Sequence, residues 1–529
     1  MGRLHEKAQA VLRLMQKPRM NTNHCFLALD RHIEGARSWL RERTLDACGY
    51  SSAILIDRLV QRLIEICLKP YTLAISSTSL LPSPGTQVNC GRASIEIGSG
   101  KIKLTLRQWL TNQIDFFLHW AFCLTAILTI KKAGNSSSPA VLVFGVGEES
   151  LLVNNDDTQF VSYCRTGPIS PLRNGRRFLI QSSTLNISSN PSEFEYCKRP
   201  LITLLRGSQL GLYGRLRLLA DHLVLLFSYF SHAVRMPPLS LLGKDFAYSR
   251  ISFELDRRGL MESIILTCAH HAAQQLWTRA LSRAKVHMIW YSQVAKPFVF
   301  AFDKLSSDVP SYRWIKADTH WVWTEAFAQF LRNLVQAEMR VVGPIVWYKP
   351  EILLPAKDTI AVAIFDVSPY VDDVALCYGE FPNYNNPRNL LLFIDDVITL
   401  KDRLETIFRL SVSLRLKTKR GYAAAYDKGY FEYIEKLHSA GIISLEHHTS
   451  NIFSLISSSH LVIAYPFTSA AYVAEFLRVP AVYYDPTKSI VRHDFSDSKS
   501  YVEFAGCLDE LMNASKAALS RVFPARTKL

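Results

Sequence analysis

Residues 457–487 read SSSHLVIAYPFTSAAYVAEFLRVPAVYYDPT and carry the clearest fold signal in this 529-residue chain. Residues 461–464 and 481–484 are short apolar runs, and residues 470–478 between them have helical spacing. Apolar runs of this length are typical of strands that are buried on both faces of a parallel sheet. Strand, helix and strand in this order therefore predict a right-handed βαβ unit.

The same alternation continues upstream of this unit. Apolar runs at residues 359–367, 412–416 and 442–446 alternate with helical patterns at residues 400–410, 427–440 and 451–457. Earlier runs of the same kind occupy residues 141–145, 286–291 and 341–346. Residues 347–358, which contain two prolines and show no period, separate the two groups. The pattern predicts an α/β protein of two lobes, each with a parallel sheet, that face each other across a cleft.

Four segments follow from this pattern. Residues 1–135 are expected to be a mostly helical extension with a small hairpin, and residues 136–350 a first Rossmann-like lobe. Residues 351–500 are expected to be a second Rossmann-like lobe. Residues 501–529 are expected to be a C-terminal helix, with packing back on the first lobe as one arrangement.

Composition and charge restrict the kind of partner. Apolar residues make up 48% of the chain and charged residues 20%, which excludes global disorder. Lys and Arg exceed Asp and Glu by 61 − 46 = 15, an excess that favours phosphates, nucleic acid or an acidic membrane surface. No helix-turn-helix, RNA-recognition or zinc-finger pattern is present, so we expect no nucleic acid partner, and a nucleic-acid-binding protein is only a remote alternative. No Cys or His cluster has metal-ligand spacing, so we expect no metal.

One apolar segment raises the question of a membrane. Residues 116–130, FFLHWAFCLTAILTI, are shorter than the ~20 apolar residues that a membrane span needs. A buried core helix and an interfacial helix both fit this stretch. The N-terminus has neither the apolar core nor the cleavage site of a secretion signal, so we expect a cytoplasmic protein.

Three groups of polar residues follow expected strands, where ligands bind in open α/β sheets. Lys417, Lys419 and Arg420 form a basic run, which suits phosphate oxygens but equally suits a solvated surface. Thr468 and Ser469 open a helix, where an anion or an ordinary N-cap is favoured. The third group is residues 366–370, in which Asp366 and Ser368 follow a strand, and Asp366 could act on a ligand or only cap a turn. The remaining candidates for ligand binding are Glu475, on the helix after Ser469, and Tyr291 and Gln293, after a strand of the first lobe.

Five segments together resemble a known family. In chain order they are YSQVAKPF (291–298), VVGPIVWYKP (341–350), IFDVSPY (364–370), PFTS (466–469) and YYDPT (483–487). This set is similar to the bacterial polysaccharide-biosynthesis proteins named for a PFTS motif. The second half of the chain also resembles glycosyltransferases of the GT-B type. The likeness extends from about residue 140 to residue 490.

The resemblance implies a glycosyltransferase of capsule or O-antigen synthesis. It implies a GT-B-like fold in which the first lobe binds the acceptor and the second binds a nucleotide-activated sugar, with CMP-activated acidic sugars favoured. The acceptor is expected to be a glycan or a lipid-linked glycan. We expect no cofactor and no metal, because Lys, Arg and helix N-termini can stabilise a departing phosphate. The catalytic base stays open among Asp366, Glu148 and Asp157, with Glu149 and Asp156 as neighbours of the latter two.

Two other functions share this architecture. A nucleotide-sugar epimerase or a non-catalytic protein that binds glycans and regulates their assembly would have the same second lobe. The excess positive charge favours peripheral association with the anionic inner membrane, where a lipid-linked acceptor resides. The oligomeric state and the stereochemistry of transfer are left open by the sequence.

Overall fold

The computed structural model describes the chain from residue 35 to residue 524, with gaps. The described residues are 35–76, 87–89, 91–96, 101–130, 139–147, 153–154, 157–169, 172, 177–182, 193–267, 274–291, 299–300, 310–345, 352–356, 358–370, 385–423, 426–448, 450–466, 468–488, 490–491 and 502–524.

The second lobe is built on a six-stranded sheet in the order β16-β15-β14-β17-β18-β20, in which all neighbouring strands are parallel. The strands are β14 (Thr359–Phe365), β15 (Ser411–Lys417), β16 (Ser444–Glu446), β17 (Leu461–Ala464), β18 (Ala481–Tyr484) and β20 (Val502–Ala505). In chain order the arrangement is 3-2-1-4-5-6, the strand order of dinucleotide-binding folds. The helices are α12 (Pro387–Phe408), α13 (Lys428–Ser439), α14 (Ile452–Ser457), α15 (Ala470–Leu477) and α16 (Leu508–Val522).

The first lobe repeats this strand order with one strand more. Its parallel sheet has the order β13-β12-β10-β9-β4-β7-β8. The strands are β4 (Ala140–Phe144), β7 (Arg177–Gln181), β8 (Phe194–Cys197), β9 (Met261–Thr267), β10 (Lys285–Ile289), β12 (Thr319–Val322) and β13 (Glu338–Val341). The short helices α6 (Gln159–Thr166), α7 (Pro200–Gly207) and α10 (Glu325–Arg332) belong to this lobe. The predicted GT-B-like fold of two Rossmann-type lobes with a helical extension is confirmed.

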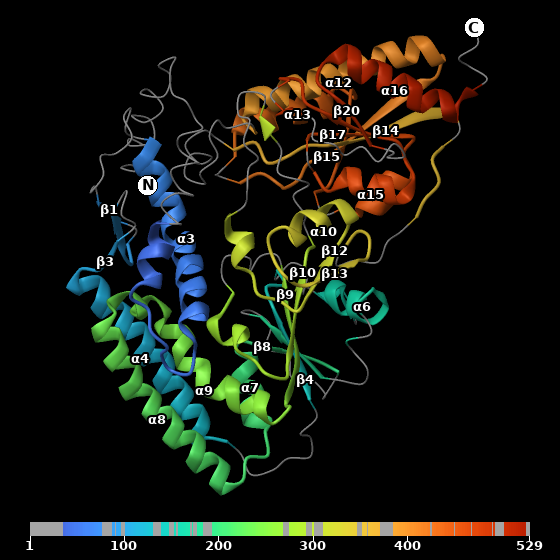
Figure 1. Ribbon diagram of the computed structural model, residues 1–529. Coiled ribbons are helices and arrows are strands. Elements are labelled where there is room, and N and C mark those ends of the chain that lie inside the picture. Colours follow the sequence, from blue (N-terminus) through green and yellow to red (C-terminus); the bar gives the residue numbers. More distant parts are fainter. Residues whose placement is uncertain are drawn as a thin grey trace.

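The two lobes meet through α15, which lies between the second sheet and the first lobe (Figure 1). One continuous apolar cluster includes Trp321 and Trp323 of the first lobe together with Tyr472 of α15. Gly343, which has a positive φ of 79° just after β13, packs against the ring of Phe476: a Cβ placed there would lie 3.1 Å from it. Because the apolar side of α15 is used in this contact, the start of the helix has a fixed position relative to both lobes.

A helical layer covers the other side of the first lobe. It contains α3 (Ser52–Ser76), α4 (Leu106–Leu128), α8 (Leu212–Arg235) and α9 (Gly243–Arg257) (Figure 1). The expected hairpin is confirmed as β2 (Ser94–Glu96) and β3 (Ile102–Lys103), and β1 (Gln87–Asn89) adds a third antiparallel strand. Thr105 and Gln108 form a reciprocal capping box at the start of α4.

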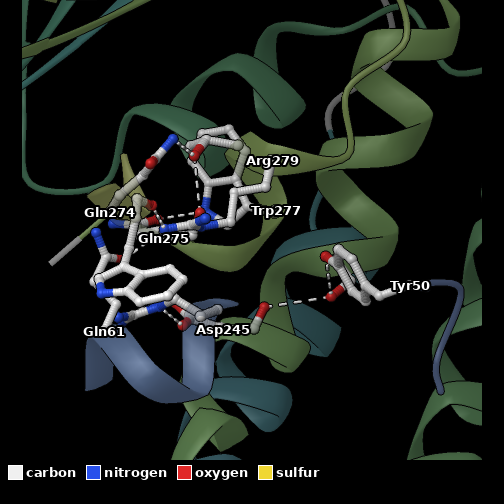
Figure 2. A network of polar contacts seen from close by, with 11 residues as sticks. Tyr50, Gln61, Asp245, Gln274, Gln275, Trp277 and Arg279 are labelled. Carbon is white, nitrogen blue, oxygen red and sulfur yellow. Dashed lines mark hydrogen bonds and ion pairs between the residues drawn. The ribbon is translucent and has the colours of Figure 1, made fainter. Parts of the chain in front are cut away.

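A buried polar network joins this layer to the first lobe (Figure 2). The guanidinium of Arg58 on α3 donates to Asp245 on α9 over 2.9 Å, and both side chains are at most 8% exposed. Arg279 lies in the loop between β9 and β10 and donates to Gln61 on α3 over 2.7 Å. The first bond joins α3 to α9 within the helical layer, and the second joins α3 to the first lobe.

The C-terminal segment departs from one expectation. Helix α16 packs on its own lobe, where Leu511 and Leu519 join the core formed by α12 and the second sheet. Packing back on the first lobe is therefore wrong for this helix. The cause is strand β20, which precedes α16 as the last parallel strand of the second sheet and returns the chain onto that sheet's face.

The apolar residues 116–130 lie mostly in α4. Phe116, Trp120 and Cys123 point into the core, whereas Phe117 and Leu118 on the opposite side are exposed. The buried residues agree with the interpretation of this stretch as a core helix. Among the described residues, no helix has the length and apolar character needed to cross a bilayer.

Candidate functional site

The candidate site lies at one edge of the second sheet, where the strand order reverses between β14 and β17. Phe365 at the end of β14 is in register with Lys417 of β15 on one side and with Ala464 of β17 on the other. The segments that follow these three strands therefore leave the sheet at the same edge. In open α/β sheets this reversal point is where ligands bind. The basic run and the hydroxyl pair, far apart in sequence, lie only two strands apart.

Two hydroxyl groups at this edge have no hydrogen-bond partner among the described residues. They belong to Ser368, which follows β14 and is 5% exposed, and to Thr468, which follows β17. Buried polar groups are nearly always paired, so an unpaired one needs an explanation. Two of them at the reversal point of a Rossmann-type sheet mark this edge as the candidate ligand site.

The hydroxyl of Ser469 is also unused by the protein's own helix. Ser469 stands at the N-cap of α15, yet its side chain makes no capping hydrogen bond. The residue has helical dihedral angles, with φ of −63° and ψ of −14°, so its side chain is not in the usual capping geometry. The alternative of a plain cap does not describe this residue.

The turn that contains Thr468 is held by backbone contacts on both sides. The hydroxyl of Tyr483 on β18 donates to the carbonyl of Thr468 over 2.7 Å. The amide of Tyr465 donates to the carbonyl of Phe365 over 2.8 Å, which ties the start of the turn to β14. A turn fixed in this way presents its hydroxyl with little loss of entropy when a ligand binds.

Asp366 holds the basic loop in place. Its carboxylate accepts a hydrogen bond from the backbone amide of Lys419 and another from the hydroxyl of Tyr430, both over 2.7 Å. Burial raises the pKa of Asp366 to about 7, against the opposing effect of these two hydrogen bonds. Because both oxygens are engaged and the side chain is buried, the geometry favours a positioning role for Asp366 over that of a catalytic base.

The raised pKa of Asp366 predicts a pH-dependent stability. The folded state binds one more proton than the unfolded state between about pH 4 and pH 7, so the free energy of unfolding falls as pH rises through this window. At about 1.4 kcal/mol per pKa unit, the loss amounts to a few kcal/mol. Chemical denaturation of an Asp366→Asn variant is expected to remove this slope, whereas exposed Asp402→Asn keeps it. An unchanged slope in Asp366→Asn would contradict the assignment.

The cations of the basic run have different surroundings. The Lys417 ammonium donates to the carbonyl of His448 over 2.6 Å, and burial lowers the pKa of Lys417. Lys417 therefore stabilises the segment that follows β16. Lys419 is exposed, and so is Arg420, whose guanidinium lies 3.4 Å from the hydroxyl of Tyr426. Of the three cations, Lys419 and Arg420 are the ones placed to meet a ligand at this edge.

Two histidines that sequence reasoning missed lie beside the basic run. His447 and His448 follow β16, with ring centroids 4.2 Å apart, and a Cβ on Gly421 would lie 3.2 Å from the His448 ring. Burial, His447 and Lys417 together lower the pKa of His448. A neutral imidazole at this edge can accept a proton. The signal for them was their place directly after the apolar run 442–446.

The other predicted site residues are placed as follows. Glu475 lies on α15 close enough to Tyr483 to contribute to raising the pKa of that tyrosine, whose main cause is burial. Tyr291 follows β10 and packs against the apolar cluster between the lobes. Asp157 lies in the short strand β6 (Asp157–Thr158), and the structure does not describe its side chain. Gln293, Glu148, Glu149 and Asp156 lie outside the described residues. Within the described ranges, no group of His, Cys, Asp or Glu is placed to hold a metal ion.

The chain belongs to the family of polysaccharide biosynthesis PFTS motif proteins, whose model matches residues 226–514. This match confirms the resemblance seen in the sequence. It covers the end of the first lobe and almost all of the second, including the edge that carries Ser368, Lys419 and Thr468. No curated protein sequence matches the chain.

Solved structures share the general architecture at low similarity. TarM is 13% identical to this chain with a TM-score of 0.31, and the match covers 55% of this chain and 53% of the TarM chain. The wall teichoic acid polymerase TagF is 9% identical to this chain with a TM-score of 0.35, and the match covers 80% of this chain and 92% of the TagF chain. A putative UDP-N-acetylglucosamine 2-epimerase from Listeria monocytogenes is 10% identical to this chain with a TM-score of 0.38. The match covers 74% of this chain and 90% of the epimerase chain. The chain spans about half the length of the first structures it matches, and no functional argument rests on these scores.

Proposed function

We propose that this protein is a glycosyltransferase of bacterial surface polysaccharide synthesis, of the capsule or O-antigen kind, that uses a nucleotide-activated sugar. The observation that supports this most is the pair of unpartnered hydroxyls, Ser368 and Thr468, at the reversal point of the second sheet. Family membership supplies the context of polysaccharide biosynthesis. The acceptor, a glycan or a lipid-linked glycan, is assigned to the first lobe.

In this proposal the donor phosphate binds at the start of α15. Thr468 and Ser469 donate hydrogen bonds to its oxygens, aided by the free amides and the dipole of the helix N-terminus. Lys419 and Arg420 approach from the other side of β14 and stabilise the negative charge that develops on the leaving phosphate. Glu475 is a candidate to bind the donor's ribose. A single hydroxyl-lined phosphate site favours a CMP-activated acidic sugar.

The base that activates the acceptor is a second part of the proposal. His448 lies at the same edge, and its lowered pKa leaves the imidazole neutral near pH 7. Glu148 and Asp157 of the first lobe are the other candidates, since they follow β4 along the chain. The proposed reaction needs no metal or cofactor, because the protein's own cations and helix dipole carry the phosphate charge.

A donor screen tests the function directly. Thermal shift with CMP-, UDP- and GDP-sugars is expected to show stabilisation by one class, with CMP-sugars favoured. Lys419→Ala is expected to weaken the binding of the sugar nucleotide about tenfold, a loss of ~1.4 kcal/mol. Binding of the free nucleoside is expected to be unaffected, because the side chain acts on phosphate. Exposed Lys436→Ala serves as the control. Stabilisation by no nucleotide sugar would reject the proposal.

The products separate a transferase from an epimerase. Release of the free nucleotide, or transfer to an added glycan, supports the transferase. Interconversion of the sugar while it stays attached to its nucleotide would instead establish the epimerase alternative. Binding without either reaction would point to a regulatory protein of glycan assembly. The proposed place of action is the cytoplasmic side of the inner membrane.

A further inference from the structure

The outer side of the helical layer carries a large number of exposed apolar side chains on two neighbouring helices. We name this surface the α4–α8 apolar face, and it consists of Leu106, Leu110, Ile114, Phe117 and Leu128 of α4 with Leu212, Leu216, Leu223, Phe227 and Val234 of α8. Leu106 and Phe227 are each 72% exposed. Single exposed apolar residues are normal on a protein surface, but a contiguous set of them marks a site of interaction.

The spacing shows that each set is a single stripe along its helix. Starting from Leu106, the members on α4 follow at positions +4, +8, +11 and +22, and starting from Leu212 those on α8 follow at +4, +11, +15 and +22. At about 100° per residue, each set falls within one quadrant of its helix. The opposite faces, with Phe116 and Tyr229 stacked at 3.7 Å, are buried in the core.

The two stripes lie on the same side of the helix pair. The helices run antiparallel, because the Trp109 indole donates to the carbonyl of Ala233 and the Trp120 indole to that of His222. Both helices pack on α9 (Figure 1). His119 of α4 lies beside Tyr248, and Gly214 of α8 lies beside Arg258 at the end of α9. At about 100° per residue these positions are on the sides of α4 and α8 opposite the stripes, so both stripes point away from α9. The ring of Phe117, a member of the α4 stripe, lies 5.1 Å from the ring of Phe230 on α8 and so bridges the two helices. The face is therefore continuous across both helices.

Charge around the face is positive. The acidic residues of α4 and α8 are Asp115, which is paired with Arg92 at 3.0 Å, and Asp221, which lies 3.9 Å from Arg217. Arg107 and Arg235 are exposed and make no ion pair with any described residue. An apolar face with a cationic border is the arrangement of helices that lie in the interface of an anionic bilayer. Docking on an uncharged protein surface would not explain why the exposed cations Arg107 and Arg235 border the apolar face.

We propose that the α4–α8 apolar face docks on an anionic lipid bilayer, with both helices lying flat in the interface. It rests on the proposed function only in the reason for docking, which is access to a lipid-linked acceptor. The apolar side chains enter the boundary between headgroups and acyl chains, and Arg107 and Arg235 contact lipid phosphates. The helical layer is in this way a membrane-binding surface attached to the acceptor lobe.

Vesicle flotation with the full chain tests the proposal. Strong binding is expected to vesicles of phosphatidylcholine with phosphatidylglycerol, and weak binding to phosphatidylcholine alone. Ile114→Glu with Phe227→Glu is expected to reduce the bound fraction about tenfold, since two charges would enter the apolar interface. The matched control is Ile352→Glu with Leu354→Glu, which places the same charges on exposed apolar positions of the linker.

Three results would overturn the proposal. They are equal vesicle binding by both double variants, no binding by the unmodified chain, and a change from dimer to monomer caused only by the face variant in solution without lipid. The last would assign the face to a second copy of the chain. Donor binding in the thermal-shift screen is expected to be the same in the face variant, so failure of docking and failure of the proposed transferase activity are distinguishable.

Discussion

Replacing Ser368 by Ala together with Thr468 by Val is expected to abolish donor binding while leaving the protein as stable as before, or more stable. Both hydroxyls lack a hydrogen-bond partner among the described residues, so the folded protein loses no bond when they are removed. A buried hydroxyl without a partner costs about 1–3 kcal/mol, and its removal recovers part of that cost. A donor that used both hydroxyls would lose two hydrogen bonds to a charged group, roughly 3–6 kcal/mol or at least a hundredfold in affinity.

Two measurements separate a binding role from a structural one. Denaturant unfolding reports the stability of the double variant, and titration with the nucleotide sugar found in the screen reports its affinity. Thr406→Val is the matched control, because its hydroxyl donates only to the carbonyl of Asp402 within α12. A double variant that loses stability and keeps its affinity would show that the hydroxyls belong to the packing of the sheet edge and not to a ligand site.

The pattern of short apolar runs and intervening helices was enough to predict two lobes with parallel sheets, but it missed β7, β8, β9 and β12 of the first sheet and β20 of the second. Fully apolar runs such as residues 461–464 leave little alternative to a buried parallel strand, and the hydrophobic pattern also predicted the linker between the lobes. The register that aligns Phe365 with Lys417 and Ala464 depends on contacts across the sheet, so no local pattern reveals it. Only the structure shows that the basic run and the hydroxyl pair share one edge.

Individual roles within the site were harder to predict. Lys417, Lys419 and Arg420 look alike in sequence, but the alternating strand directs Lys417 toward the carbonyl of His448 and leaves the other two exposed. Asp366 was a candidate base because it follows a strand, and its burial against Tyr430 makes it a support for the loop. The exposed side of α4 was equally hidden, because an apolar run shows how apolar a helix is and not how many of its faces are covered.

Replacing Asp245 by Ala is expected to be the most destabilising single change, at about 3–5 kcal/mol. Asp245 is the carboxylate that pairs with the buried Arg58, and the fully buried Arg279 lies in the same network (Figure 2). Burial, and next the charge of Arg58, lower the pKa of Arg279 to about 9, which shows how poorly this site accommodates a second positive charge. Without Asp245 the charge of Arg58 would stay buried and uncompensated. Denaturant unfolding measures the loss.

Two further variants show whether charge is the cause. Glu432→Ala removes the exposed partner of Lys428 and is expected to cost less than about 1 kcal/mol, as surface ion pairs do. Arg58→Met with Asp245→Leu removes both charges and is expected to recover most of the loss, because a buried ion pair can be replaced by apolar groups of similar size. If the double variant is as unstable as Asp245→Ala, the network acts through shape and hydrogen bonding. In either case the bond from Arg279 to Gln61 still joins α3 to the first lobe. Donor binding is expected to be unchanged, because the core of the second lobe does not include these residues.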